Sequence, residues 1–216
     1  MQPVGARPYV RGMRRITIIA AAAATVIVAA AIAIPSAGAG QDVQKHDGGG
    51  GHHSRELANA IARARIALAP YATDLASAQT AGYKLTITQM MPNMGWHFMN
   101  PDVTEFDVTR PPILVYVRKG DQAQLVAAEW VFPSKPAKPP LPGAKYGSFA
   151  AACHYLDGTF VPRKNEAACA KTSPESGAAF SFWHPDLVTL HLWLWYPNPD
   201  GVFNGTNPLI APFNRG

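Results

Sequence analysis

The spacing of apolar residues changes at Gly82, and this change constrains the fold more than any other feature. Between Ser54 and Gly82 the apolar residues recur at helical intervals, which predicts one helix up to Pro70 and a second one from Pro70 to Ala81. Proline ends the first helix and suits the first position of the next, because it has no backbone N–H to donate. From residue 83 to 88 apolar and polar residues alternate, which is typical of a strand with one buried face.

Further strands are predicted along the rest of the chain, at residues 94–99, 113–117, 125–132, 178–183 and 187–196. The second and third of these flank a hairpin turn at 119–121. Residues 133–142 contain five prolines and are expected to form an extended loop, and residues 146–175 are expected to be irregular. This order predicts an α+β fold, with N-terminal helices packed on a curved antiparallel sheet of about five to seven strands. The cystatin-like and NTF2-like rolls are analogous arrangements.

The first 39 residues have the order of a secretory signal peptide. Arginines within residues 11–15 precede an uncharged apolar run at 16–34, and residues 37–39 supply the small residues of a cleavage site. Because the run is long for a signal peptide, an uncleaved membrane anchor is the alternative. The sequence therefore predicts an exported protein of the periplasm, cell envelope or extracellular space, with a membrane contact only if the leader remains.

The rest of the chain divides into a linker and a domain. Residues 40–53 are expected to be a flexible linker, since 48–51 are four consecutive glycines with histidines on both sides. Residues 54–216 are long enough for a single domain. The chain has 19 Lys+Arg and 14 Asp+Glu, and four of the arginines lie in the leader, so the remainder is close to neutral. Nucleic acid is therefore excluded as a partner, because phosphate binding needs a clustered positive field.

The two cysteines, Cys153 and Cys169, are predicted to form a disulfide. An even number of cysteines in an exported chain favours a structural bridge. Their spacing is not the C-x-x-C spacing of redox and metal sites.

The segment HLWLWYPNPDGVF, residues 191–203, is the most unusual part of the sequence. On a strand its first histidine and its two tryptophans would share one face. Because a buried indole N–H needs a partner, that face is expected to be a half-buried surface or a cleft. The predicted surface for a ligand or partner consists of Trp96, Trp193, Trp195, Asn198 and Phe203.

Parts of the sequence resemble a family of exported bacterial proteins of unknown function. The resemblance covers residues 72–208, and its specific part is the motif LHxWxWxxNPxGxF…NP that begins at Leu190. Met94-Gly95-x-His97 and the strand that holds Glu129 also match. The chain departs from the family pattern before Met94, where Pro92-Asn93 replaces two glycines. The family has no assigned activity, so the resemblance implies no reaction.

Metal-ligating side chains occur on three of the predicted strands. If these strands are neighbours, His97, Glu129 and His191 meet, and two imidazoles with one carboxylate suit an open divalent-metal site. Met94 would shift the preference toward copper. The alternative is a hydrogen-bonded His–Glu–Trp cluster that fixes the sheet and binds nothing.

Other candidate residues are interpreted as structural. Four of the six methionines lie within residues 90–101, and most of them are expected to fill gaps in the packing. His184 and His154 are interpreted as half-exposed histidines of turns. No residue is assigned as catalytic, since the chain has no G-x-S-x-G, phosphate-loop, dinucleotide or H-E-x-x-H motif.

The sequence thus favours a non-enzymatic binding or structural domain of the cell envelope, whose partner is an unknown small molecule or envelope protein. The alternative is a protein that binds copper or another divalent metal ion through His97, His191 and either Glu129 or Met94. A third hypothesis is a hydrolase or oxygenase that uses the same residues with one open coordination position.

Overall fold

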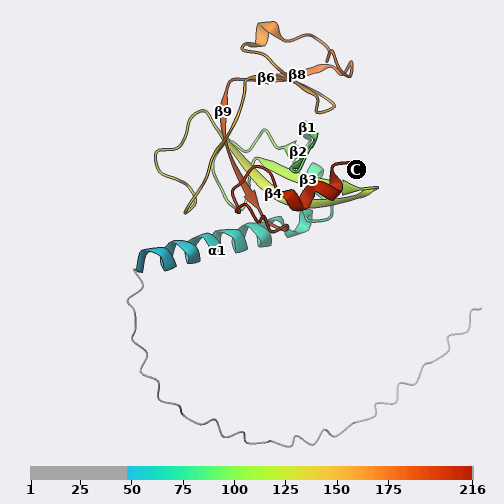
Figure 1. Cartoon of the computed structure of the whole chain (residues 1–216). Helices are drawn as coiled ribbons and strands as arrows, with labels where there is room; N and C mark the ends of the chain where they lie inside the picture. The colour runs from blue at the N-terminus through green and yellow to red at the C-terminus, as the bar shows by residue number, and fades with distance from the viewer. Residues whose placement is uncertain (1–47, 216) are drawn as a thin grey trace, which may run out of the picture. The chain divides into compact units, whose positions relative to one another are not determined.

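A computed structural model describes residues 48–215, which contain two antiparallel sheets and an N-terminal helical segment (Figure 1). The strands of the large sheet, in spatial order, are β1 (Leu85–Met91), β2 (Gly95–Met99), β3 (Ile113–Lys119), β4 (Gln122–Phe132), β9 (Leu187–Trp193) and β5 (Gly147–Phe149). The strands of the small sheet are β7 (Phe160–Pro162), β6 (Ala152–Tyr155) and β8 (Phe180–His184). The helical elements are α1 (Gly48–Leu68), η1 (Ala69–Tyr71), α2 (Leu75–Thr80), η2 (Glu166–Ala168) and η3 (Pro208–Phe213).

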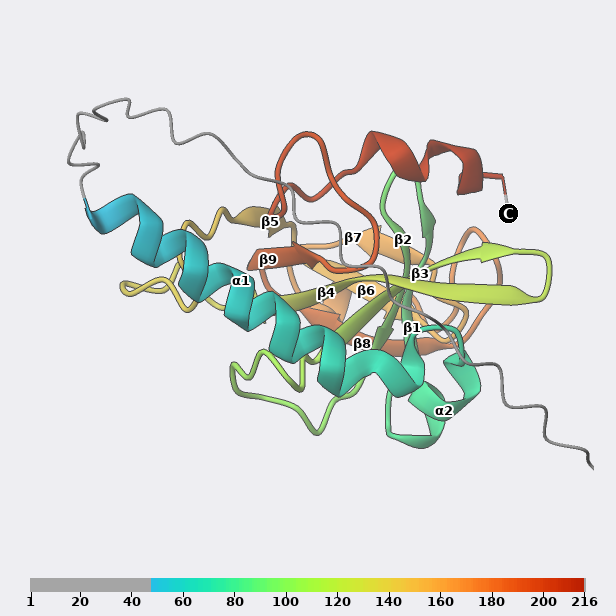
Figure 2. The ribbon, with the colours of Figure 1, turned by 90° about the horizontal axis from the view of Figure 1, so that it is seen from below.

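The large sheet is buried on both faces. Leu114, Leu125 and Leu192 point to the face covered by α1, where Ala64 and Leu68 of the helix join the same core. Figure 2 shows α1 crossing this face. The opposite face carries a second core. The predicted α+β fold, with helical elements on a curved antiparallel sheet, is confirmed.

Both N-terminal helices begin at residues other than the predicted ones. Helix α1 begins at Gly48, so residues 48–53 are not the predicted linker. An existing helix gains one hydrogen bond with each added residue, which offsets part of the entropy that glycine loses. The second helix begins only after Asp74, whose side chain accepts a hydrogen bond from the Ser77 N–H. The predicted signal peptide and residues 40–47 of the predicted linker lie outside the described residues.

Two strands of the small sheet, β6 and β7, and strand β5 of the large sheet lie in a region where the sequence predicted irregular structure, whereas β8 coincides with the strand predicted at 178–183. Strands β5, β6 and β7 have only three or four residues each, which is too short for a pattern of alternation. The small sheet is joined to β1 by a hydrogen bond from the Gln89 N–H to the Gly158 carbonyl. It lies on the side of the large sheet that faces away from α1 (Figure 1).

The predicted disulfide between Cys153 and Cys169 is present. It joins β6 to the residue that follows η2. Disulfides of this structural kind are typical of proteins that fold in oxidising compartments. Among the described residues, no helix has both the length and the apolar character needed to cross a membrane.

Replacing Gly95 with alanine is expected to destabilise the domain by about 3 kcal/mol, from backbone strain together with overpacking. Gly95 has a φ of 131°, and a Cβ atom there would lie 2.6 Å from the Tyr116 carbonyl oxygen. The matched control is Gly120→Ala, since Gly120 also has a positive φ but open space around it. Guanidinium unfolding measures both variants, and equal losses would contradict the role given to the close approach at Gly95.

Candidate metal centre

Three side chains from three strands of the large sheet meet on the face opposite α1. His97 lies on β2, Glu129 on β4 and His191 on β9. Glu129 and His191 are directly paired across neighbouring strands, while β3 lies between β2 and β4. One ligand atom from each of the three residues lies within 4.8 Å of the others. The three side chains therefore converge as the metal hypothesis expected, although β2 and β4 are not neighbouring strands.

The His97 ring is held between two polar groups. Its Nδ1 atom lies 2.7 Å from the Thr88 hydroxyl, and its Nε2 atom lies 3.4 Å from a carboxylate oxygen of Glu129. A hydrogen bond at one ring nitrogen of a histidine fixes the orientation of the other, as outer-shell partners do around metal sites. The Nε2 atom is therefore the one available to an ion beside Glu129.

His191 is buried, and neither of its ring nitrogens has a hydrogen-bond partner. Its ring contacts the rings of Trp193 and His97, with centroid separations of 5.0 and 6.1 Å. A buried polar group without a partner costs about 1–3 kcal/mol. Such a group in a native protein calls for an explanation, and an ion that it binds is one.

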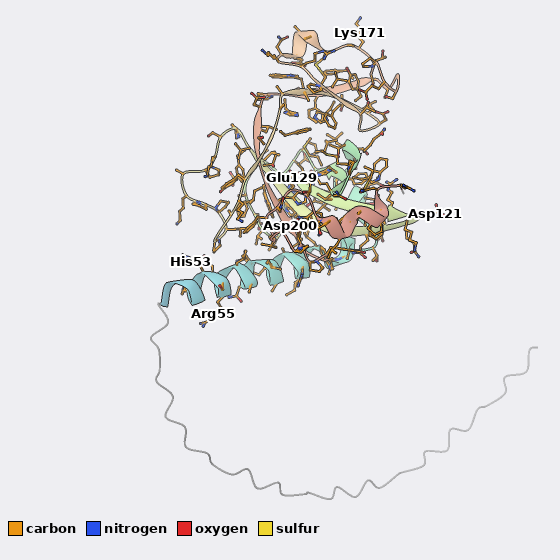
Figure 3. The ribbon with its side chains drawn as sticks, viewed as in Figure 1. His53, Arg55, Asp121, Glu129, Lys171 and Asp200 are labelled. Carbon is orange, nitrogen blue, oxygen red and sulfur yellow. A yellow bond between two sulfur atoms is a disulfide. The ribbon has the colours of Figure 1, made fainter. Side chains whose placement is uncertain are left out.

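Burial makes the uncharged forms of all three groups favourable. It raises the pKa of Glu129 to about 8, against a smaller lowering by the hydrogen bond from Thr189. It also lowers the pKa of His97 to about 4 and that of His191 to about 3. A cation would reverse this for the carboxyl group, because a bound ion favours the ionised form of its ligands. Glu129 lies inside the body of the domain rather than at its rim (Figure 3).

A cavity of about 260 Å³ lies beside the His97–Glu129 pair. Its lining comes from both sheets and consists of Ile87, Thr88, Met91, Met94, His97, Met99, Ile113, Glu129, Val131, Ser148, Phe149, His154, Phe182, His184, Leu187 and Thr189. Met94 therefore lines the same cavity as His97. Met91 and Met99, which the sequence assigned to packing, line it too. The cavity offers space for a bound molecule next to the candidate metal ligands.

The predicted aromatic surface is not formed. Trp193 and Phe203 are buried, with 2% and 7% of their surface exposed. Trp193 lies in the core beside the metal candidates, whereas Trp195 packs against the core under α1. The two tryptophans do not share a face because β9 ends at Trp193 and the alternation of side chains ends with it. The N–H groups of the next two residues both donate to the Val126 carbonyl.

The other two members of that surface are also placed by structural contacts. Trp96 is partly buried and packs against the core under α1, with the Arg118 guanidinium 4.8 Å from its ring centroid. Asn198 is half-buried, and its amide donates a hydrogen bond to the Thr206 carbonyl. These five residues therefore give no common ligand surface.

His154 and His184 are not the half-exposed turn residues that the sequence indicated. They lie on β6 and β8 and are buried, with 1% and 9% of their surface exposed. The sequence did not indicate this burial, because His154 follows Cys153 and His184 precedes Pro185, and both positions suggested turns. The cross-strand contacts that bury them exist only in the folded protein.

Comparison of the chain with protein-family models, with curated proteins and with solved structures gave no match. The resemblance to a family of exported bacterial proteins therefore stays a prediction, as does the analogy to the cystatin-like and NTF2-like rolls.

The metal-free protein is expected to be most stable near pH 6.5. Since burial raises the folded pKa of Glu129 to about 8 from 4.5, its stabilising contribution is complete below pH 4.5 and is lost as the pH rises through 8. Since burial lowers the pKa values of His97, His154 and His191 from 6.5, their contribution is lost as the pH falls below 6.5.

Guanidinium unfolding in EDTA between pH 5 and 9 tests this expectation. Glu129→Gln is expected to remove the loss of stability between about pH 6.5 and 8, because the amide does not ionise. The exposed Glu166→Gln is the control and is expected to keep it. A profile that Glu129→Gln leaves unchanged would contradict the assignment to this carboxyl group.

Proposed function

We propose that this domain binds a divalent transition-metal ion through His97, Glu129 and His191. The observation that carries the proposal is His191, a buried imidazole with two unpartnered nitrogens beside a second imidazole and a carboxylate. An ion between them would satisfy a His191 nitrogen and would ionise Glu129. This set of ligands leaves a coordination position free, since zinc centres with four ligands are the rule.

Zinc and copper are the candidate ions. Two imidazoles and one carboxylate form the ligand set of several zinc enzymes. Met94 lines the adjoining cavity, and a thioether ligand would favour copper. Export to the periplasm, cell envelope or extracellular space belongs to this proposal, supported by the disulfide and by the order of residues in the leader.

A catalytic role is the second candidate, and the cavity is the observation in its favour. A metal-bound water at an open position would face a space of about 260 Å³ that can admit a small molecule. If no metal binds, the three residues form a neutral polar cluster. The domain would then be a binding or structural module for a small molecule or an envelope protein.

Elemental analysis tests the proposal on the full chain without a purification tag. His46, His52 and His53 are replaced by alanine in every sample, because these histidines near the glycine run could hold metal loosely. The protein is offered zinc or copper(II), desalted and analysed beside a His97→Gln/His191→Leu variant. We expect near-stoichiometric metal in the first and none in the second, with both folded by near-UV circular dichroism. Equal metal contents would overturn the proposal.

A further inference from the structure

A second pair of histidines lies across the cavity from the His97–Glu129 pair. The Nε2 atoms of His154 and His184 are 3.0 Å apart, and both rings line the cavity. The Nδ1 atom of His154 lies 2.7 Å from the Ile87 carbonyl oxygen, and that of His184 lies 2.6 Å from the Pro185 carbonyl oxygen. The two rings thus make three polar contacts in a row.

The number of protons does not match these contacts. Two neutral imidazoles carry one N–H each, whereas each of the three contacts needs one proton. A carbonyl oxygen cannot donate, so both Nδ1–H groups are used for the two carbonyls. The two Nε2 lone pairs then face each other, which is favourable only with a cation between them. That cation is either a third proton or a metal ion.

The geometry of the pair fits a metal ion. An ion about 2.0 Å from two nitrogens, in tetrahedral geometry, holds them roughly 3.3 Å apart, close to the observed separation of 3.0 Å. The backbone carbonyls at Nδ1 also match the outer-shell partners that metal-ligating histidines usually have.

The rings are held in place by aromatic neighbours. The His154 ring stacks on Phe182 with a centroid distance of 4.7 Å and an angle of 6° between the planes. It also lies 5.7 Å from the Phe160 ring, and the His184 ring lies 5.1 Å from that of Phe149. Three phenyl rings therefore fix both imidazoles, so that little side-chain entropy remains to be lost when an ion binds.

The surroundings select a soft ion of low charge. The pair lies among phenyl rings, where a monovalent ion is less costly to bury than a divalent one. The same cavity is lined by Met91, Met94 and Met99, whose thioethers are soft ligands. Imidazole together with thioether is a ligand combination that suits copper(I).

We propose that His154 and His184 form a second metal site, specific for copper(I), on the side of the cavity formed by the small sheet. The site goes beyond the proposed centre at His97, Glu129 and His191 and shares none of these three residues with it. Each can be present without the other.

Titration with copper(I) tests the proposal. The full chain without a tag, with His46, His52 and His53 replaced by alanine, is titrated under ascorbate, and native mass spectrometry counts the ions. The starting variant is His97→Gln/Glu129→Gln/His191→Leu, which lacks the first centre. We expect one tightly bound copper(I) in this variant, and none after His184→Phe is added, since phenylalanine retains the ring contacts.

The outcomes separate the two proposals. If the wild-type protein binds no zinc but the starting variant binds copper(I), the proposal of the first centre is overturned and that of the second site stands. A starting variant that binds no copper(I), or a His184→Phe variant that keeps it, overturns the second site.

A measurement on the wild-type protein avoids dependence on folded variants. Silver(I) serves as a redox-inert probe, and nitrogen-15 spectra of the imidazoles follow each ring atom. We expect the Nε2 signals of His154 and His184 to shift on silver binding while both Nδ1 atoms stay protonated. Unchanged Nε2 signals, or a shared proton between the rings that persists with excess silver, would overturn the proposal.

Discussion

Replacing His191 with leucine is expected to stabilise the metal-free protein and to destabilise the protein in the presence of its ion. In EDTA the substitution removes two buried nitrogens that have no partner, for an expected gain of about 1–2 kcal/mol. With zinc at about 100 times its dissociation constant, the wild-type protein gains about 2.7 kcal/mol that the variant lacks. The order of stability therefore reverses between the two conditions.

Chemical denaturation with and without zinc measures this reversal. Glu129→Gln is the matched control, because it removes a charged ligand and keeps both nitrogens of His191. It is expected to lose the response to zinc without the gain from removing those nitrogens. A His191→Leu variant that loses stability in EDTA would show that leucine forfeits favourable contacts of the imidazole there, and it would remove the main support for the metal centre.

Removing the disulfide is expected to cost roughly 3 kcal/mol of unfolding free energy. The bond joins residues 16 apart in the sequence, so its reduction releases a loop in the unfolded chain. The Cys153→Ala/Cys169→Ala variant also loses packing at Cys153, which is fully buried. Guanidinium unfolding of this variant, and of the wild-type protein with and without a reductant, measures the two contributions.

Hydrogen exchange locates the effect. We expect protection to fall most in β6 and β8, because β6 carries Cys153 and pairs with β8. A loss of less than 1 kcal/mol in both comparisons, or an even loss of protection over α1 and the large sheet, would contradict the role given to this bond.

The candidate metal ligands could be predicted from the sequence because strand alternation fixes the face of each side chain. Glu129 shares a strand face with Ala127 and Val131, which indicated a buried carboxylate. His97 and His191 lie in segments that the sequence predicted as strands. The sequence left open whether these strands were neighbours. Their order in the sheet comes from hairpin pairing and from the long return of β9 to β4.

The second pair of histidines and the cavity could not be predicted in the same way. The strands that carry Phe160 and His154 are too short for a period to be visible, and the contact with the Ile87 carbonyl joins segments far apart in the chain. The aromatic surface was predicted wrongly because the alternation was extended past the real end of β9 at Trp193. Strand ends depend on backbone pairing, which side-chain patterns do not record.

Two consecutive residues of β1 hold one histidine from each of the two proposed metal sites. The Ile87 carbonyl accepts a hydrogen bond from His154, and the hydroxyl of Thr88 bonds to His97. An ion that pulled either imidazole would therefore shift the same short piece of backbone that orients the other. Binding at the two positions would then be thermodynamically linked, and any factor by which one ion changed the affinity for the second would apply equally in reverse.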